Sequence, residues 1–144
     1  VGFNSRLDSL NAFVLNEKLK GFNKIKKSRE GLFNYYIKNL KDIEFIKKPI
    51  KENENIVLNY FTIKVPIEIR SSFIDHLKKR GVSSAIYYQI PIHKQPVIKK
   101  LSLNIDKLSN TENASRKIMS IPFYAFMKKK EKEMVIEEIS KFVH

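Results

Sequence analysis

The chain has 144 residues, a length that suits one domain, and its 42% hydrophobic and 30% charged residues are typical of a soluble globular protein. It has no cysteine, which excludes disulfides, a thiolate nucleophile and cysteine-bound metal sites, and its three widely spaced histidines make any metal site unexpected. The net charge of +13 would suit an anionic partner such as nucleic acid, but lysine outnumbers arginine 23 to 5, a bias that an AT-rich coding sequence would also produce.

The first predicted element is a long helix over residues 6–40. Ser5 and Asp8 have the S-x-x-D spacing of a capping box, so the helix should begin near Arg6. Apolar residues recur at helical spacing as far as Leu40, and Gly21 should bend the helix or divide it into two nearly continuous ones. A solvated face explains the lysines between the apolar positions, which are Lys18, Lys20, Lys24, Lys26 and Lys27.

The middle of the chain alternates between predicted strands and a helix. Residues 43–46 could form a short strand, and Ile56–Val65 is the strongest strand signal of the chain. Residues 68–80 have the apolar spacing of a helix, and Gly81 suits the position just after its end. A second strand is expected over Ala85–Tyr88. The order of strand, helix and strand, with antiparallel neighbours, predicts an α+β fold.

The segment Ala85–Pro96, A-I-Y-Y-Q-I-P-I-H-K-Q-P, joins a strand-like start to a loop stiffened by two prolines. Phenols and the imidazole of His93 on such a rigid loop are typical of a functional site, and a strand end with a surface histidine is the alternative. Strand alternation assigns Tyr87 to the core. The amide of Gln95 is expected to brace the loop.

The last third of the chain is predicted to be mostly helical. Residues 97–108 are expected to be irregular, and the capping-box spacing of Ser109 and Glu112 precedes a short helix predicted over 111–118. An extended segment over residues 121–124 should follow, and a final helix should cover about 130–143.

The residues alone carry no self-contained catalytic constellation. The sequence has no glycine-rich phosphate-binding motif and no G-x-S-x-G nucleophile elbow. No apolar run approaches the roughly 18 residues that a membrane-spanning helix needs, and no signal peptide is expected. Composition and spacing therefore predict a basic α+β domain with one tyrosine- and histidine-bearing loop.

Several segments, in order and in register, carry a resemblance to a known family. Gly2–Ala12 reads G-F-N-S-R-L-D-S-L-N-A, and Leu19–Tyr36 places Arg29 inside its helix. Arg70–Val82 ends its helical pattern at Gly-Val, Tyr87–Pro96 has the form Y-Y-x-x-P-x-H-x-Q-P, and S-I-P stands at 120–122. Together these segments resemble the C-terminal part of the DegT/DnrJ/StrS family of sugar aminotransferases, over essentially the whole chain.

The resemblance implies the small C-terminal domain of a fold-type I aminotransferase, with a long N-terminal helix and a short antiparallel sheet that carries helices on one face. Residues 1–40 would be the linking helix and the start of the domain, and residues 41–144 the domain itself. Such enzymes use pyridoxal 5′-phosphate to aminate a keto nucleotide-sugar, commonly with glutamate as donor, for surface-polysaccharide or amino-sugar biosynthesis. They are expected to be cytoplasmic homodimers with shared active sites. Their Schiff-base lysine would lie in an N-terminal domain outside this chain, which alone would be inactive.

The resemblance also assigns four contact residues, none of them catalytic and none metal-binding. Asn4 matches an asparagine that reaches the partner's cofactor phosphate, and a turn asparagine is the alternative. Arg6 matches an arginine near the partner's sugar pocket, and a surface arginine is the alternative. Tyr88 and His93 match the loop that closes over the nucleotide-sugar. The rival functions are a basic nucleic-acid-binding module and a fragment without activity. The first is unexpected because the positive charge comes mostly from lysine.

Overall fold

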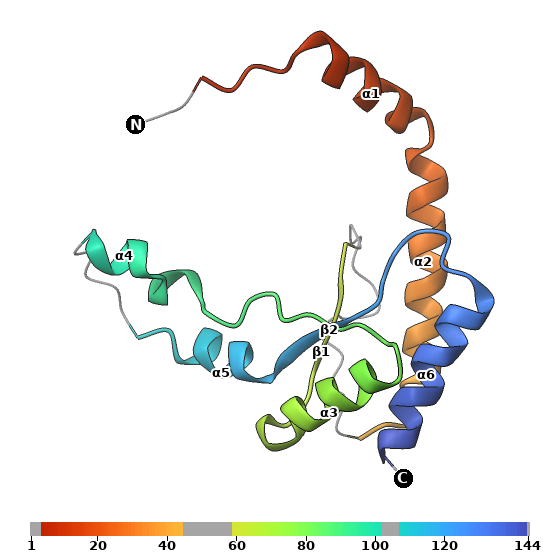
Figure 1. Cartoon of the computed structure of the whole chain (residues 1–144), viewed down its shortest axis with the longest axis vertical. Coiled ribbons are helices and arrows are strands. Elements are labelled where there is room, and N and C mark those ends of the chain that lie inside the picture. Colours follow the sequence, from red (N-terminus) through yellow and green to blue (C-terminus); the bar gives the residue numbers. More distant parts are fainter. Residues whose placement is uncertain (1–3, 45–58, 102–106, 144) are drawn as a thin grey trace.

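Six α-helices, one short 3-10 turn and a two-stranded sheet make up the part of the chain that the computed structural model describes, which is residues 4–44, 59–101 and 107–143. In Figure 1, α2 and α6 form one side of the molecule, α4 and α5 lie at the opposite side, and the sheet runs between them. The elements in chain order are α1 (Ser9–Lys20), α2 (Phe22–Asn39), β1 (Phe61–Lys64), α3 (Ile67–Lys79), η1 (Ile92–Lys94), α4 (Pro96–Lys100), α5 (Ser109–Lys117), β2 (Ile118–Ile121) and α6 (Lys129–Val143).

The sheet consists of β1 and β2 in antiparallel register, with Thr62 opposite Ser120. The strand predicted over Ala85–Tyr88 is wrong, because Ala85 alone joins the sheet. Its backbone exchanges two hydrogen bonds, of 3.0 and 2.7 Å, with Ser120 on the edge of β2 that β1 leaves open. The second strand is Ile118–Ile121, at the place where a helix end was predicted. The α+β class itself is confirmed.

One face of the sheet supplies the centre of the core. Phe61 and Ile63 alternate with more exposed residues along β1, as a strand with one buried face requires. Helices α2, α3 and α6 cover this face with fully buried side chains, among them Tyr36, Phe73, Leu77 and Ile139.

Tyr36 brings the only phenol among the most deeply buried side chains of the described residues into this core. Its hydroxyl donates a hydrogen bond of 2.8 Å to the backbone carbonyl of Pro122, just beyond β2. Burial raises the pKa of Tyr36, so the phenol stays protonated and remains a donor. This bond ties α2 to the end of the sheet.

Helix α3 ends in the way that its sequence predicts. Gly81 has a positive φ of 77°, the left-handed conformation that glycine tolerates best. Its N–H donates to the carbonyl of Lys78 at 3.1 Å, and the N–H of Val82 donates to that of Leu77 at 2.9 Å. This pair of bonds is the Schellman arrangement, and the buried side chains of Leu77 and Val82 add its usual apolar contact.

An ionic cluster joins α3 to α6. The Glu138 side chain is 8% exposed and accepts a hydrogen bond of 2.8 Å from Lys141. His76 Nε2 lies 3.0 Å from the Glu138 backbone carbonyl, and Arg80 Nε lies 3.8 Å from the carboxylate. The hydrogen bond from Lys141, together with the nearby Arg80 and His76, holds the pKa of Glu138 below its usual range despite burial.

The predicted N-terminal helix is divided at Gly21 into α1 and α2, as expected. Its predicted start near Arg6 is wrong. Asp8 is the N-cap, because its carboxylate accepts a hydrogen bond of 2.8 Å from the backbone N–H of Asn11 and satisfies a free donor of the first turn. This bond, together with a second one from the Asn11 side-chain amide, lowers the pKa of Asp8. Helix α1 buries no residue.

The other boundaries follow the predictions closely, with one addition. The prediction for 68–80 corresponds to α3, and the final helix begins at Lys129. The short helix α4 (Pro96–Lys100) lies where irregular structure was expected. Ile43 and Glu44 form no strand, whereas 45–46 and 56–58 lie outside the described residues. Within the described ranges, no helix has the length and apolarity to cross a membrane.

Candidate functional site

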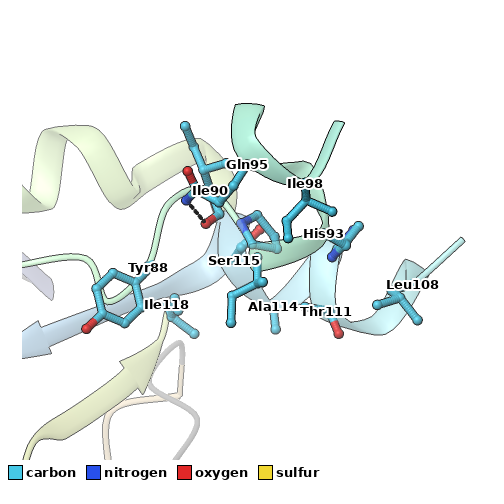
Figure 2. Close-up of a pocket in the computed structure, with 12 residues that line it drawn as sticks. Tyr88, Ile90, His93, Gln95, Ile98, Leu108, Thr111, Ala114, Ser115 and Ile118 are labelled. Carbon is cyan, nitrogen blue, oxygen red and sulfur yellow. Dashed lines mark hydrogen bonds between the residues drawn. The ribbon is translucent and has the colours of Figure 1, made fainter. Parts of the chain in front are cut away.

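An apolar groove with a volume of about 770 Å³ lies between the proline-bounded loop and α5. Figure 2 shows the loop and α4 on one side of it and α5 on the other. Isoleucines supply much of the lining, including Ile90, Ile98 and Ile118, while His93 and Tyr88 are its aromatic polar members. Ile92 is 79% exposed and Ile90 50%, so the groove opens to solvent within this chain. It therefore offers an apolar surface with a few polar atoms, the usual form of a ligand site.

The loop that carries His93 is held by its own hydrogen bonds. Gln95 Nε2 donates to the carbonyl of Ile90 at 3.0 Å, which confirms the predicted bracing role of this amide (Figure 2). The turn η1 adds backbone bonds from Lys94 to Pro91 at 2.9 Å and from Gln95 to Ile92 at 3.0 Å. The loop is thus held in fixed turns, because the backbone donors of Lys94 and Gln95 are paired and Pro91 and Pro96 have none.

One carboxylate of α5 connects two consecutive residues of the loop. Glu112 Oε1 lies 3.3 Å from His93 Nε2, and Glu112 Oε2 lies 2.6 Å from Lys94 Nζ. The side chains of His93 and Glu112 are only 11% and 19% exposed. The hydrogen bonds from Lys94 and then His93 lower the pKa of Glu112, so its carboxylate is ionised at neutral pH.

Glu112 belongs to the site although its position in the sequence did not predict this. Its spacing from Ser109 predicted a capping box, in which its side chain would return to the start of α5. The side chain binds the loop instead, and Leu108 occupies the N-cap position without a side-chain hydrogen bond. No local pattern could have found this contact, because His93 and Glu112 are 19 residues apart in the chain.

Tyr87 and Tyr88 are both at the surface, but only Tyr88 belongs to the groove. The Tyr88 side chain is 69% exposed and lines the groove. Tyr87 is 39% exposed and its ring lies 4.5 Å from that of Tyr60, so its predicted place in the core is wrong. The reason is that only Ala85 pairs with the sheet, so the alternation of a strand does not decide where the Tyr87 side chain points.

Asn4 and Arg6 lie in the extended arm that precedes α1. Both are exposed, and neither has a hydrogen bond or ion pair with another part of the chain that the structure describes. They do not line the groove, whereas Tyr88 and His93 do. The structure therefore brings together two of the four predicted contact residues and leaves the other two on a separate arm.

The donor set of this chain fits one contact to pyridoxal phosphate but not a complete cofactor pocket. The groove has no lysine or arginine among its described lining residues, and a phosphate bound there would lack a cationic partner. The amide of Asn4, exposed on the arm, is chemically suited to donate a hydrogen bond to a phosphate oxygen. Within the described residues, no group of three acidic or histidine side chains is placed to hold a metal ion.

Comparison with known proteins gives consistent matches over nearly the whole chain. The sequence pattern of the DegT/DnrJ/EryC1/StrS aminotransferase family matches residues 1–140. A UDP-2-acetamido-2-deoxy-3-oxo-D-glucuronate aminotransferase of Pseudomonas aeruginosa is 34% identical over 127 residues, which are 88% of this chain and 34% of that protein. A pleiotropic regulatory protein of Geobacillus stearothermophilus is 27% identical over 99% of this chain and 38% of its own length.

Solved structures have the same fold. DesV of S. venezuelae, in complex with a ketimine intermediate, is 25% identical with a TM-score of 0.89, over 99% of this chain and 38% of that one. NtdA of Bacillus subtilis, with bound cofactor PMP, is 28% identical with a TM-score of 0.87, over 99% of this chain and 34% of that one. The chain therefore spans a little over a third of the length of the proteins that it matches.

Proposed function

Because the chain belongs to the DegT/DnrJ/EryC1/StrS aminotransferase family, we propose that it is the C-terminal part of a pyridoxal-phosphate-dependent enzyme that aminates a keto nucleotide-sugar. Glutamate is the proposed amino donor, and amino-sugar or surface-polysaccharide biosynthesis is the proposed pathway. The observation that carries the proposal is the mostly buried His93 at the edge of an apolar groove, in the segment that also carries the family resemblance.

The division of the chain follows from this proposal. Residues 1–40 link the cofactor domain to the small domain and also begin the small domain, whose core includes Tyr36 of α2. Residues 41–144 form the rest of the small domain. Pyridoxal phosphate supplies the electron sink for amino transfer when it is bound, and we place its Schiff-base lysine in the part of the enzyme outside this chain. This chain contributes side chains that bind and orient the cofactor phosphate and the sugar substrate.

Four residues have proposed contacts. Asn4 donates its amide N–H to the cofactor phosphate of the partner subunit, and Arg6 offers a bidentate guanidinium to a diphosphate or carboxylate of the sugar substrate. Tyr88 and His93 hydrogen-bond the sugar. The exposed arm of Asn4 and Arg6 supports a role across a subunit boundary, because neither side chain has a partner within the described part of its own chain.

The exposed apolar surfaces support a larger assembly. Leu10, Phe13 and Leu19 of α1 are between 63% and 73% exposed, which is a large apolar area for one isolated helix. A homodimer with shared active sites in the cytoplasm, completed by the cofactor domain, would cover such a surface and the groove. This assembly also explains why the substrate contacts lie on two separate parts of the chain.

The test uses the full-length protein with a keto nucleotide-sugar and glutamate, and it measures the amino sugar formed. We expect His93→Ala to raise KM about tenfold, as the loss of one hydrogen bond of about 1.4 kcal/mol would. Asn4→Ala should weaken cofactor retention about tenfold or more, since it removes a bond to a charged phosphate. Asn34→Ala, an exposed amide on α2, is the matched control and should change neither quantity.

Two results would contradict the proposal at different levels. Unchanged KM and cofactor retention in the double variant Asn4→Ala/His93→Ala would remove the assigned contacts and leave the reaction class standing. If the wild-type protein aminates no keto nucleotide-sugar, the reaction class itself is wrong.

A further inference from the structure

We propose that Glu112 is a positioning residue for the proline-bounded loop. Its carboxylate orients the imidazole of His93 and holds this loop against α5. The inference rests on the proposed contact between His93 and the sugar, and it assigns a role to a side chain outside the segments that carry the family resemblance. It also specifies which atom of His93 meets the substrate and what kind of group that atom binds.

The geometry of Glu112 gives each carboxylate oxygen its own partner. Oε1 meets His93 Nε2 at 3.3 Å, and Oε2 meets Lys94 Nζ at 2.6 Å. The two partners are adjacent in the loop, so one side chain of α5 fixes two neighbouring positions. Because both His93 and Glu112 are mostly buried, water competes with this contact less than it does at an exposed ion pair.

Glu112 is itself well anchored. Its backbone N–H donates to the carbonyl of Leu108 at 3.0 Å, and its own carbonyl accepts a hydrogen bond of 2.8 Å from Ser115 Oγ. On the loop side, the bond from Gln95 to Ile90 closes the turn around His93. The carboxylate therefore connects two segments that are each held in place by independent hydrogen bonds.

The charge of Glu112 determines the tautomer of His93. An ionised carboxylate can only accept a hydrogen bond, so Nε2 carries the proton and donates it. In the neutral imidazole Nδ1 is then the acceptor. A hydrogen-bond donor such as a sugar hydroxyl is the group that this nitrogen binds, whereas a carbonyl or phosphate oxygen would find no proton there.

The first arm of the test compares KM and kcat of the full-length enzyme for a keto nucleotide-sugar. We expect Glu112→Ala to raise KM about tenfold and to leave kcat within about twofold. This pattern is expected when a variant loses an interaction with the substrate that is equally strong in the ground state and in the transition state. The double variant Glu112→Ala/His93→Ala should be no worse than His93→Ala alone, because Glu112 acts through His93. Asn113→Ala, the exposed neighbour on α5, is the matched control and should leave KM unchanged.

The second arm measures the ring nitrogens of His93 directly by long-range 1H–15N correlation spectra. The His93 signals are assigned by their absence in His93→Asn. The wild-type protein should show a protonated Nε2, and Glu112→Ala should show a mixture of tautomers. If Glu112→Ala does not fold, Glu112→Gln replaces it in both arms. Glutamine has one oxygen and one NH2 group, which only donates, so it cannot offer His93 and Lys94 an acceptor atom each, and a raised KM is again expected.

The outcomes separate the inference from the function on which it rests. An additive rise of KM in the double variant, or an unchanged KM in Glu112→Ala while His93→Ala raises it, would overturn the positioning role and leave the proposed function intact. An unaltered tautomer in Glu112→Ala would overturn it through the spectra, even if the enzyme aminates no sugar that is tried. Unchanged KM in His93→Ala would overturn both the inference and the substrate contact.

Discussion

Glu138 is a charged residue almost enclosed between α3 and α6, and its surroundings make stability depend on pH. Its folded-state pKa is lowered below the ordinary value of 4.5, chiefly by the hydrogen bond from Lys141. A group with a depressed folded-state pKa stabilises the fold above its unfolded pKa, and this contribution is lost as the pH falls through the folded value.

We therefore expect Glu138→Gln to lower the free energy of unfolding at pH 7, with a difference from the wild type that shrinks as the pH falls below about 4.5. Urea denaturation followed by circular dichroism between pH 3 and pH 7 measures this difference. Glu137→Gln is the control, since Glu137 also contacts Lys141, at 2.7 Å, but is 62% exposed, and its loss at pH 7 should be smaller. A difference that stays constant over this range would contradict the assigned role of Glu138.

Two carboxylates show what residue spacing can and cannot predict. Asp8 and Glu112 both stand at the fourth position of a capping-box pattern. Asp8 instead caps its own helix start, and Glu112 binds the loop of His93. Spacing identified both positions as structurally important but assigned the wrong partner, because a carboxylate binds the nearest unpaired donor, which need not be local in sequence.

At the scale of single elements, two glycines give predictions of opposite sign, one just after α3 and one inside α2. Gly81 has a φ of 77°, and an added Cβ would meet only Met134 Cε, at 3.6 Å, so Gly81→Ala tests backbone strain without a clash. We expect a loss of about 1–2 kcal/mol. Gly31 lies inside α2, where an added Cβ would meet nothing within 4 Å, so Gly31→Ala should stabilise the protein by up to about 1 kcal/mol.

Equilibrium urea unfolding of the two variants and the wild type provides the comparison. The two midpoints should move in opposite directions from that of the wild type, with unchanged slopes. Stabilisation by Gly81→Ala would show that the left-handed turn does not end α3 in solution.

The helices were more predictable than the strands. Residues 68–80 and 130–143 show apolar residues at helical spacing, and both form helices within one or two residues of the predicted bounds. The strand predicted over Ala85–Tyr88 is a single bridge, and Ile118–Ile121 is a strand that was not predicted. A helix satisfies its backbone from its own residues, whereas a strand needs a partner that the local sequence does not specify.

At the scale of the whole molecule, the exposed apolar residues of α1 allow the stability of the fold to be tested separately from the association of subunits. The Leu10 side chain is 73% exposed, whereas Leu32 of α2 is 5% exposed and belongs to the core. We expect Leu10→Ala to change the free energy of unfolding of the chain by less than about 0.5 kcal/mol, and Leu32→Ala to cost about 2–5 kcal/mol.

The same substitution should have a different effect on the proposed homodimer. If α1 lies in an interface of the full-length protein, Leu10→Ala removes buried apolar surface there and should weaken dimerisation about tenfold. Analytical ultracentrifugation over a range of concentrations measures the dissociation constant. An unchanged dissociation constant would place α1 outside the interface.

The order of residues was sufficient to predict the α+β class, most helix bounds, the braced loop and the family, because these features depend on local spacing and on motifs. Tertiary structure decided that the partner of β1 is Ile118–Ile121, that Tyr87 leaves the core and that Glu112 meets His93. All three features depend on contacts between segments that are distant along the chain. Which segments meet is settled only in the folded chain, where β1 pairs with β2 and the loop of His93 lies against α5.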